Sequence, residues 1–338
     1  MMLLDVRETY HPLPWQTQPW QHLLESKMRD RLPHGLLLRG AEGIGKSHFS
    51  LAFGHFLLCS DPSELGACEQ CKGCKLAAAG THPDLMIVEP EEKGKIIKVE
   101  QVRRVVEFTA KRAQFDGYRV VIIAPAEAMN VNASNALLKS LEEPGEKTVL
   151  ILVSHQISGI LATIRSRCQA VDFRTPASAD CLPWLEASLS GSNAAEQASV
   201  LLSVAVGAPL AARDFAKSNW LAERSTLINE WLNVLRGSAD PVYVAGRWAG
   251  LPQTELLDGL MAWQIDVSRI VAGAPESVVN KDLFPSLQAA ASIISSRAIH
   301  PFYEHLQQVQ AMLAGPSNPN LQLLFERLLI KWSETKNS

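Results

Sequence analysis

The sequence predicts an α/β domain built on a parallel sheet, followed by an all-helical half. Short apolar runs alternate with helical patterns as far as about Phe173, which is typical of parallel strands joined by crossover helices. Beyond Phe173, apolar residues recur at helical spacing through to Trp332, and strand-like runs disappear. The 338 residues are enough for roughly two to three domains, each with its own core.

The elements of the first half follow one another in a regular order. A helix over Trp20–Arg31 ends before Pro33, and a helix over Asn135–Glu143 is stopped by Pro144. Cysteines and small residues fill Cys59–Gly80, which we expect to be a loop. The apolar runs predict strands at Gly35–Arg39, Asp84–Val88, Arg119–Ala124 and Thr148–Val153, and the periodic segments predict further helices at His48–Leu58 and Val99–Arg112.

The second half is predicted to consist of amphipathic helices. The clearest of them are Trp220–Leu235, Thr254–Val271, Ile299–Leu313 and Leu321–Trp332. Large aromatic side chains at helical spacing usually lie in a core. We therefore expect most of the tryptophans of this half to be buried, namely Trp220, Trp231, Trp248, Trp263 and Trp332.

Composition and charge exclude several classes of protein. The chain is 47% hydrophobic and 20% charged, which excludes a disordered chain, a collagen-like repeat and a simple charged coiled coil. Its formal charge is 32 − 35 = −3, whereas an autonomous DNA-binding protein usually has a basic excess. Neither a signal peptide nor an apolar run of about 20 residues is recognisable. We expect a cytosolic protein that has no membrane partner and keeps its thiols reduced.

A phosphate-binding loop is predicted at residues 40–47. The segment Gly40-Ala-Glu-Gly43-Ile-Gly45-Lys46-Ser47 satisfies G-x4-G-K-[ST], follows a predicted strand and opens a predicted helix. Its glycines let backbone N–H groups close around phosphates, Lys46 would reach the β- and γ-phosphates, and Ser47 would hold Mg²⁺. The alternative is a chance match in a glycine-bearing turn.

The acidic residues that hydrolysis requires are missing from the sequence. A second strand of such a site should end in carboxylates that hold Mg²⁺ and position water. The strand at Arg119–Ile123 is instead followed by Ala124 and Pro125, which can do neither. Glu127 lies two residues further on, and we interpret it as a solvated turn residue. We expect a chain that binds nucleotide but hydrolyses it poorly or not at all.

Four of the six cysteines are spaced for a metal site. They fall as Cys59-x8-Cys68-x2-Cys71-x2-Cys74, and thiolates at two-residue separations can wrap a tetrahedral Zn²⁺. A closed four-cysteine site is structural, because catalytic zinc keeps an open position. A redox C-x-x-C pair and an iron–sulfur cluster are the alternatives. Cys168 and Cys181 are interpreted as ordinary small core residues.

Two further motifs carry a resemblance to a known family. They are Asn135-Ala-Leu-Leu-Lys-Ser-Leu-Glu-Glu-Pro144 and Thr163-Ile-Arg-Ser166-Arg167-Cys168. Together with the phosphate loop and the four-cysteine insertion, they resemble the clamp-loader subunits of bacterial DNA polymerase III, which are of the AAA+ class. The resemblance is strong from about Trp15 to Phe173 and rests on helical layout beyond. Because this chain lacks the acidic pair, it resembles the stator-type subunit of that family rather than the motor subunit.

The resemblance implies an architecture and roles for single residues. Residues 1–173 would form an AAA+ P-loop core with a zinc-binding insertion, residues 174–217 a small helical lid, and residues 218–338 a helical collar for oligomerisation. Arg167 would be an arginine finger that reaches the ATP of a neighbouring subunit in trans. Ser154 would sense the γ-phosphate. Gly207–Leu210 matches the lid motif, in which a motor subunit has an arginine near Leu210.

The resemblance also implies a function and partners. The chain would help the ATP-dependent loading of the sliding clamp onto primed DNA, in a heteropentamer with motor (gamma/tau) and delta subunits of the polymerase holoenzyme. Its ligands would be structural Zn²⁺ and ATP or ADP with Mg²⁺. One alternative is an autonomous P-loop ATPase with a zinc knuckle that acts in replication or repair. Another, a zinc-dependent nucleic-acid binder, conflicts with the absent basic excess.

Overall fold

The computed structural model describes residues 10–92, 94–115, 117–189, 194–217, 220–314 and 319–336. These residues form two compact units. The first unit extends to Ala187 and includes Gly207–Ala211, and the second comprises Ser188–Val206 and the chain from Ala212 onwards. The separate lid over residues 174–217 stays a prediction, since the boundary between the two units falls inside it.

The first unit is built on a five-stranded sheet. Every neighbouring pair of strands is parallel, and their order is β2-β3-β4-β1-β5. All residues of β3 and β4 are buried, as expected for strands that are covered on both faces. The parallel sheet predicted from the sequence is therefore confirmed. The strands are β1 (Gly35–Arg39), β2 (Leu85–Val88), β3 (Arg119–Ile123), β4 (Thr148–Ser154) and β5 (Gln169–Asp172).

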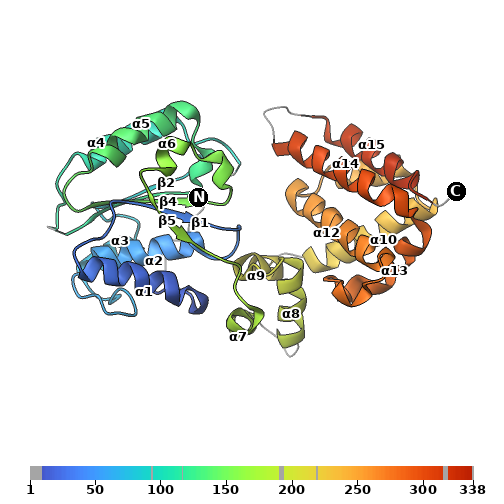
Figure 1. Ribbon diagram of the computed structural model, residues 1–338, viewed down its shortest axis with the longest axis horizontal. Helices are drawn as coiled ribbons and strands as arrows, with labels where there is room; N and C mark the ends of the chain where they lie inside the picture. The colour runs from blue at the N-terminus through green and yellow to red at the C-terminus, as the bar shows by residue number, and fades with distance from the viewer. Residues whose placement is uncertain are drawn as a thin grey trace. The chain divides into compact units, whose positions relative to one another are not determined.

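Helices cover both faces of this sheet. Figure 1 shows α1, α2 and α3 on one side and α4, α5 and α6 on the other. Their bounds are α1 (Thr17–Met28), α2 (Lys46–Leu58), α3 (Lys72–Ala78), α4 (Val99–Thr109), α5 (Val131–Glu142) and α6 (Ala162–Arg165), and α7 (Ser178–Ser188) follows at the end of the unit. The covered sheet brings the carboxyl ends of β1, β3 and β4 to one edge, where the loop after β1 begins.

Four elements of this unit, β5, α3, α6 and α7, were not among those predicted individually. The strand β5 has only one buried residue, Val171, so it lacks the apolar run that marks a strand. The helix α3 lies inside the segment that we expected to be a loop. Its N-cap is Cys71, an unusual residue at this position, whose sulfur accepts a hydrogen bond from the amide of Cys74.

A buried ion pair secures the far edge of the sheet. Asp84, just before β2, is fully buried, and its carboxylate lies 3.0 Å from Nη2 of Arg119. The same carboxylate accepts hydrogen bonds from the amides of Gln114 and Phe115. Because every oxygen is satisfied, the pair fixes the chain between α4 and β3 without leaving a buried charge uncompensated.

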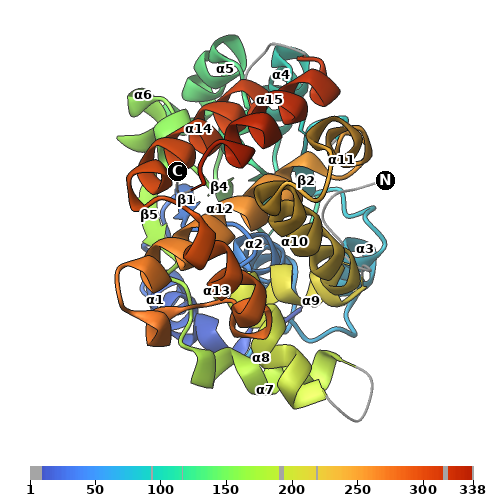
Figure 2. The same ribbon diagram turned by 90° about the vertical axis from the view of Figure 1, so that its right-hand side faces the viewer.

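The second unit is helical, and the part of it that the structure describes contains no strand. Its helices, which are labelled in Figure 2, are α8 (Ala194–Val204), α9 (Pro209–Lys217), α10 (Trp220–Arg236), α11 (Pro241–Trp248), α12 (Gln253–Val271), α13 (Phe284–Ile293), α14 (Ser296–Ala314) and α15 (Leu321–Ser333). Four of them, α8, α9, α11 and α13, were not among the helices predicted individually from the sequence. The N-terminal end of α9, Pro209–Ala211, belongs to the first unit.

Tryptophans form the centre of the helical core. Trp231, Trp248, Trp263 and Trp332 are all buried, as predicted, whereas the side chain of Trp220 lies outside the described residues. Trp231 stacks on Trp332 with ring centroids 4.0 Å apart, and the Trp332 indole donates a hydrogen bond to the Trp231 carbonyl. Such stacking adds about 0.5–1.5 kcal/mol beyond the burial of apolar area.

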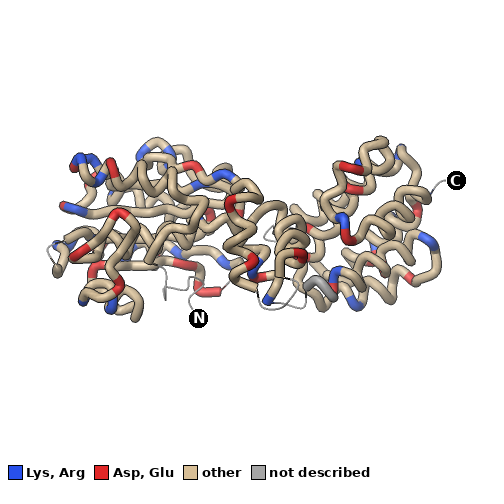
Figure 3. The backbone as a smooth tube through the Cα atoms, turned by 90° about the horizontal axis from the view of Figure 1, so that it is seen from below, with Lys and Arg blue, Asp and Glu red and all other residues tan. Residues whose placement is uncertain are grey.

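Charged residues of both signs are interspersed over each unit, as Figure 3 shows. Among the described residues, no single helix is long and apolar enough to cross a membrane. The pair α8 and α9 meets the criteria of length and composition only when taken together, and it is bent by 115°.

Candidate nucleotide and metal sites

The loop between β1 and α2 has the backbone conformation of a phosphate-binding turn. Gly40, Gly43 and Gly45 all have positive φ, and Gly45 is the N-cap of α2 with φ +98°. A Cβ atom at Gly45 would lie 2.6 Å from Nε2 of Gln16, so only glycine fits there. Among the described residues, no side chain caps the N-terminus of α2, which leaves its first amides available to an anion.

Three donors hold the carbonyl groups of this loop from outside. The backbone amide of Leu210 donates to the carbonyl of Gly43 (2.9 Å). The side chains of Trp15 and Gln16 donate to the next two carbonyls, those of residues 44 and 45, at 2.9 and 2.8 Å. In a planar trans peptide the C=O and N–H point in opposite directions. The three N–H groups of the same peptides therefore point away from these donors, as a phosphate cradle requires.

Lys46 is buried and folded back on its own loop. Only 2% of its surface is exposed, and its ammonium donates to the carbonyl oxygens of Gly40 (2.7 Å) and Ala41. Burial lowers the pKa of Lys46 to about 8, although Glu127 and Glu42 oppose the shift. The structure thus places all the predicted loop residues in one strand–loop–helix turn, with Ser47 next to Lys46. Nucleotide binding by them stays a prediction.

The carboxyl ends of β3 and β4 lie beside the phosphate loop. They offer a hydroxyl at the end of β4 but no carboxylate directly after β3, where hydrolysis would require one. Ala124 and Pro125 directly follow β3, as the sequence indicated. Ser154 is the last residue of β4 and lies opposite Arg39, the residue before Gly40. Its hydroxyl is fully buried and has no hydrogen-bond partner among the described residues. A buried hydroxyl without a partner at this edge fits the role of a phosphate-sensing group.

The interpretation of Glu127 as a solvated turn residue was wrong. Its side chain is half-buried, and Oε1 accepts hydrogen bonds from the amides of His155 (2.8 Å) and Gln156 (3.1 Å). Its other oxygen is buried and has no hydrogen-bond partner in the part of the chain that the structure describes. Gly159 makes the close approach possible, because a Cβ there would lie 2.9 Å from Cβ of Glu127. Glu127 therefore fixes the chain just after Ser154.

His155 gives this edge a neutral imidazole. Burial lowers the pKa of His155, and the nearby charge of Lys46 lowers it further, whereas Glu42 and Glu127 oppose the shift. No pattern in the sequence connects Glu127 with His155, because the two residues lie 28 positions apart and meet only through the pairing of β3 with β4.

The four predicted cysteines come together. Their sulfur atoms all lie within 4.8 Å of one another. The Cys68 and Cys74 sulfurs are 4.0 Å apart, and those of Cys71 and Cys59 are 3.8 Å apart. A tetrahedral zinc site with Zn–S distances of about 2.3 Å puts its sulfurs roughly 3.8 Å apart. The four thiols therefore fit a structural Zn²⁺ ion.

Backbone amides support the anionic state that this cluster needs. Amides of the module donate to the sulfurs of Cys59, Cys68 and Cys71 at 3.3–3.4 Å. Burial by itself would raise the pKa of Cys71, but hydrogen bonds from Cys74 and Ser60 lower it to about 6. Burial raises the pKa of Cys59 and Cys74, and a bound cation would offset that cost.

The remaining two cysteines are outside this cluster. Cys181 is buried in α7, and Cys168 is half-buried beside Gly35. Burial raises the pKa of Cys168 to about 12, so its thiol is inert at neutral pH.

Arg167 follows α6 and is exposed. Its Nη2 atom forms an ion pair with Glu142 at the end of α5 (2.6 Å), and Nη1 donates to the carbonyl of Thr163 (3.0 Å). The two motifs that carry the family resemblance thus meet in the fold, one through Glu142 and the other through Arg167. Both side chains of the pair are 36–50% exposed, so the pair contributes at most about 1 kcal/mol.

Comparison with known proteins gives consistent matches. The family model described as DNA polymerase III, delta subunit matches residues 15–177, and the model for the C-terminal part of the delta subunit matches residues 218–334. The DNA polymerase III subunit delta' of Pseudomonas aeruginosa is 37% identical over 93% of this chain and 97% of its own length. The subunits delta' of Yersinia pestis and Bacillus subtilis are each 31% identical, over 94% and 92% of this chain and 94% of their own lengths.

Among solved structures, a DNA polymerase III gamma subunit-related protein from Thermotoga maritima aligns with 93% of this chain and 99% of its own. The TM-score is 0.49 at 18% sequence identity.

The cysteine cluster predicts the metal content of the protein. Purified chain should contain about one zinc ion per molecule, and Cys71→Ser should lose most of it because the site then lacks a ligand. Cys168→Ser removes a thiol outside the cluster and should keep the zinc. Elemental analysis by mass spectrometry after gel filtration measures both. A wild-type chain with no zinc near one equivalent would contradict the assignment.

The buried ammonium of Lys46 predicts a pH dependence of nucleotide binding. Lys46 attracts phosphate only when protonated, so the affinity for ADP should fall several-fold as the pH rises from 7 to 9, through its pKa of about 8. Lys46→Arg keeps its charge throughout this range and should show a flat profile. Titration with fluorescent ADP measures both profiles, and equal pH dependence in the two chains would contradict the prediction.

Proposed function

Since the chain belongs to the family of DNA polymerase III subunits delta', we propose that it is the stator-type subunit of a clamp loader in DNA replication. In this role it helps other subunits to load the sliding clamp onto primed DNA and turns over little or no ATP itself. The proposed partners are motor (gamma/tau) and delta subunits in a heteropentamer. DNA and the clamp are reached through this assembly, in keeping with the near-neutral charge of the chain.

We assign the architecture accordingly. The first unit is the AAA+ P-loop core with its zinc-binding insertion, the helices around residues 174–217 are the lid, and the helices from residue 218 form the collar. The parallel sheet with β1 and β4 beside the phosphate loop supports the core assignment. The backbone amide of Leu210 donates a hydrogen bond to the Gly43 carbonyl, and this contact between the proposed lid and the phosphate loop supports the lid assignment.

The residues that follow β3 are the observation on which the proposal of a stator rests. A motor needs carboxylates there, and this chain has Ala124 and Pro125. Glu127 is the nearest carboxylate, but one of its oxygens is occupied by two backbone amides. A motor subunit would also have an arginine near Leu210 for the same nucleotide. The intact loop supports ADP or ATP with Mg²⁺ as a ligand that is held rather than consumed. The alternative, an autonomous ATPase, would require an acid at position 124 or 125.

Arg167 is the proposed arginine finger. The exposure of its side chain and the weak pair with Glu142 leave it able to turn toward a neighbouring subunit. A guanidinium at the γ-phosphate of that subunit would stabilise the charge of the transition state, an effect of about 10³ or more in rate at the site concerned.

Reconstitution with motor subunits tests this role. Arg167→Ala should lower the DNA-stimulated ATPase of the assembly several-fold, because one of its sites loses a guanidinium. Arg165→Ala changes an exposed arginine two residues away and should leave the rate unchanged. Gel filtration should show intact assembly for both variants. Unchanged ATPase in an intact Arg167→Ala assembly would refute the finger.

A further inference from the structure

We propose that the cysteine module supports the nucleotide site, and that His11 is the positioning residue that connects the two. The module comprises Cys59–Cys74, and the connection is a strap formed by Tyr10–Gln16. Hydrogen bonds tie one end of the strap to the module and the other end to the phosphate loop. The inference rests on the proposed function only in taking the loop of residues 40–47 as the place where nucleotide binds.

The C-terminal end of the strap orients the phosphate loop. Trp15 and Gln16 hold the carbonyls of Ile44 and Gly45, and Gln16 is fully buried. The Gln16 side chain also accepts a hydrogen bond from the amide of Leu13 (3.0 Å), which fixes its direction. A shift of this end would release the Ile44 carbonyl and leave the Gly45 carbonyl held only by the amide of Phe49, so the opposite N–H groups could rotate away from the phosphate position.

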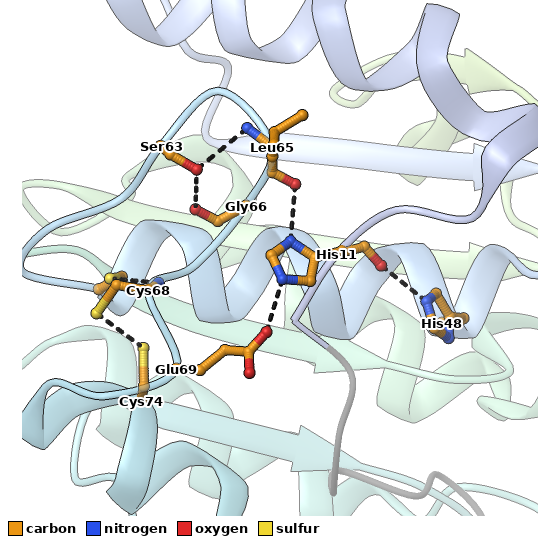
Figure 4. Close-up of polar contacts among 9 residues, drawn as sticks. His11, His48, Ser63, Leu65, Gly66, Cys68, Glu69 and Cys74 are labelled. Carbon is orange, nitrogen blue, oxygen red and sulfur yellow. Dashed lines mark hydrogen bonds and ion pairs between the residues drawn. The ribbon is translucent and has the colours of Figure 1, made fainter.

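The N-terminal end of the strap is bound by the module. Figure 4 shows the His11 ring between two of its residues. Nδ1 lies 3.0 Å from the Leu65 carbonyl oxygen, and Nε2 lies 2.7 Å from the Glu69 carboxylate. The amide of Ala67 donates to the Tyr10 carbonyl (3.3 Å). These contacts join the strap to the segment between Cys59 and Cys68, through Leu65 and Ala67, and to Glu69, the residue that follows it.

The same strap is fastened to α2. His48, in the first turn of α2, forms a hydrogen bond with the backbone carbonyl of His11 (2.9 Å), which is also drawn in Figure 4. Gly66 allows the module to pack closely against the strap, because a Cβ there would lie 2.5 Å from both Nδ1 of His11 and the Tyr10 carbonyl oxygen. The module, the strap and the helix that carries Lys46 therefore meet at His11.

Metal binding would fix the part of the module that His11 contacts. The segment that contains Leu65 begins at Cys59 and ends at Cys68, and a shared ion would tie these two residues together. Trp20 in α1 donates to the Glu64 carbonyl (2.8 Å), so the same segment also supports α1. Loss of the metal would free both ends of the segment and loosen its hold on the strap. The occupancy of the metal site and the order of the phosphate loop are then coupled, and the coupling is reciprocal.

Hydrogen exchange of the zinc-loaded chain tests the connection without nucleotide or partner subunits. In His11→Ala, the amides of Leu210 and Phe49, which donate to the Gly43 and Gly45 carbonyls of the loop, should exchange roughly fivefold faster or more, because the strap loses its anchor. Amides of β3 and β4, and the zinc content, should stay as in the wild type. His300→Ala removes the histidine of another exposed His–Glu pair, the one with Glu304 in the second unit, and should change none of these amides.

Two further experiments distinguish a role of His11 in positioning the phosphate loop from a role in the overall stability of the unit. Glu69→Gln keeps an oxygen acceptor for the His11 ring and should retain wild-type exchange in the loop, whereas Glu69→Ala should resemble His11→Ala. Removing zinc from the wild type with a chelator should speed exchange in the loop, and in His11→Ala it should add little. Wild-type exchange of the Leu210 and Phe49 amides in zinc-loaded His11→Ala would overturn the proposal, and so would faster exchange in β3 and β4 to the same degree.

The proposed clamp-loader function can fail independently of this result. The exchange experiment uses the chain alone, and a loop that responds to His11 would stand even if Arg167→Ala left the assembly unaffected. Conversely, if His11→Ala did not change amide exchange at the phosphate loop, the proposed role of His11 would fail even if Arg167 proved to be an arginine finger.

Discussion

The outward anchoring of three consecutive carbonyls in the phosphate loop is the constraint on which the rest of the site depends. Trp15, Gln16 and the amide of Leu210 hold these carbonyls, and the N–H groups of the same peptides are thereby turned inward. The anchors come from residues 15–16 and from the segment around Leu210, so two parts of the first unit that are far apart in sequence are both hydrogen-bonded to the loop. This explains why a short glycine-rich turn can be held without any side-chain cap on α2.

The charges around this loop are arranged for binding rather than for turnover. Lys46 supplies a cation whose pKa burial has lowered to about 8. At the end of β3 the carboxylates of a motor are replaced by Ala124 and Pro125, and Glu127 holds the chain after Ser154 instead of facing a metal ion with both oxygens. In the proposed assembly the two parts of the ATPase chemistry would be divided between subunits: this chain would keep a cradle for nucleotide and would offer Arg167 to its neighbour.

The sequence predicted what depends on local spacing. The strands β1, β3 and β4, the glycine-lysine turn and the four cysteines follow from periodicity and ligand spacing, and the structure places them as expected. The edge strand β5 was missed because only Val171 in it is buried. The roles of Glu127 and His11 could not be predicted, since their partners are 28 and 58 residues away and are brought near only by the folded sheet and module. Tertiary contacts of single polar residues leave no periodic trace in a sequence.

The most direct test of the central claim is the rate of ATP hydrolysis by the isolated chain at saturating Mg²⁺–ATP. The proposed site would bind adenine nucleotide through Lys46, and Ala124 and Pro125 follow β3 in place of the carboxylates that activate water. The account predicts a rate equal to that of Lys46→Ala, in a preparation whose wild-type chain binds fluorescent ADP and whose variant does not. Robust hydrolysis that Lys46→Ala abolishes would contradict it, because the chain would then be a motor and not a stator.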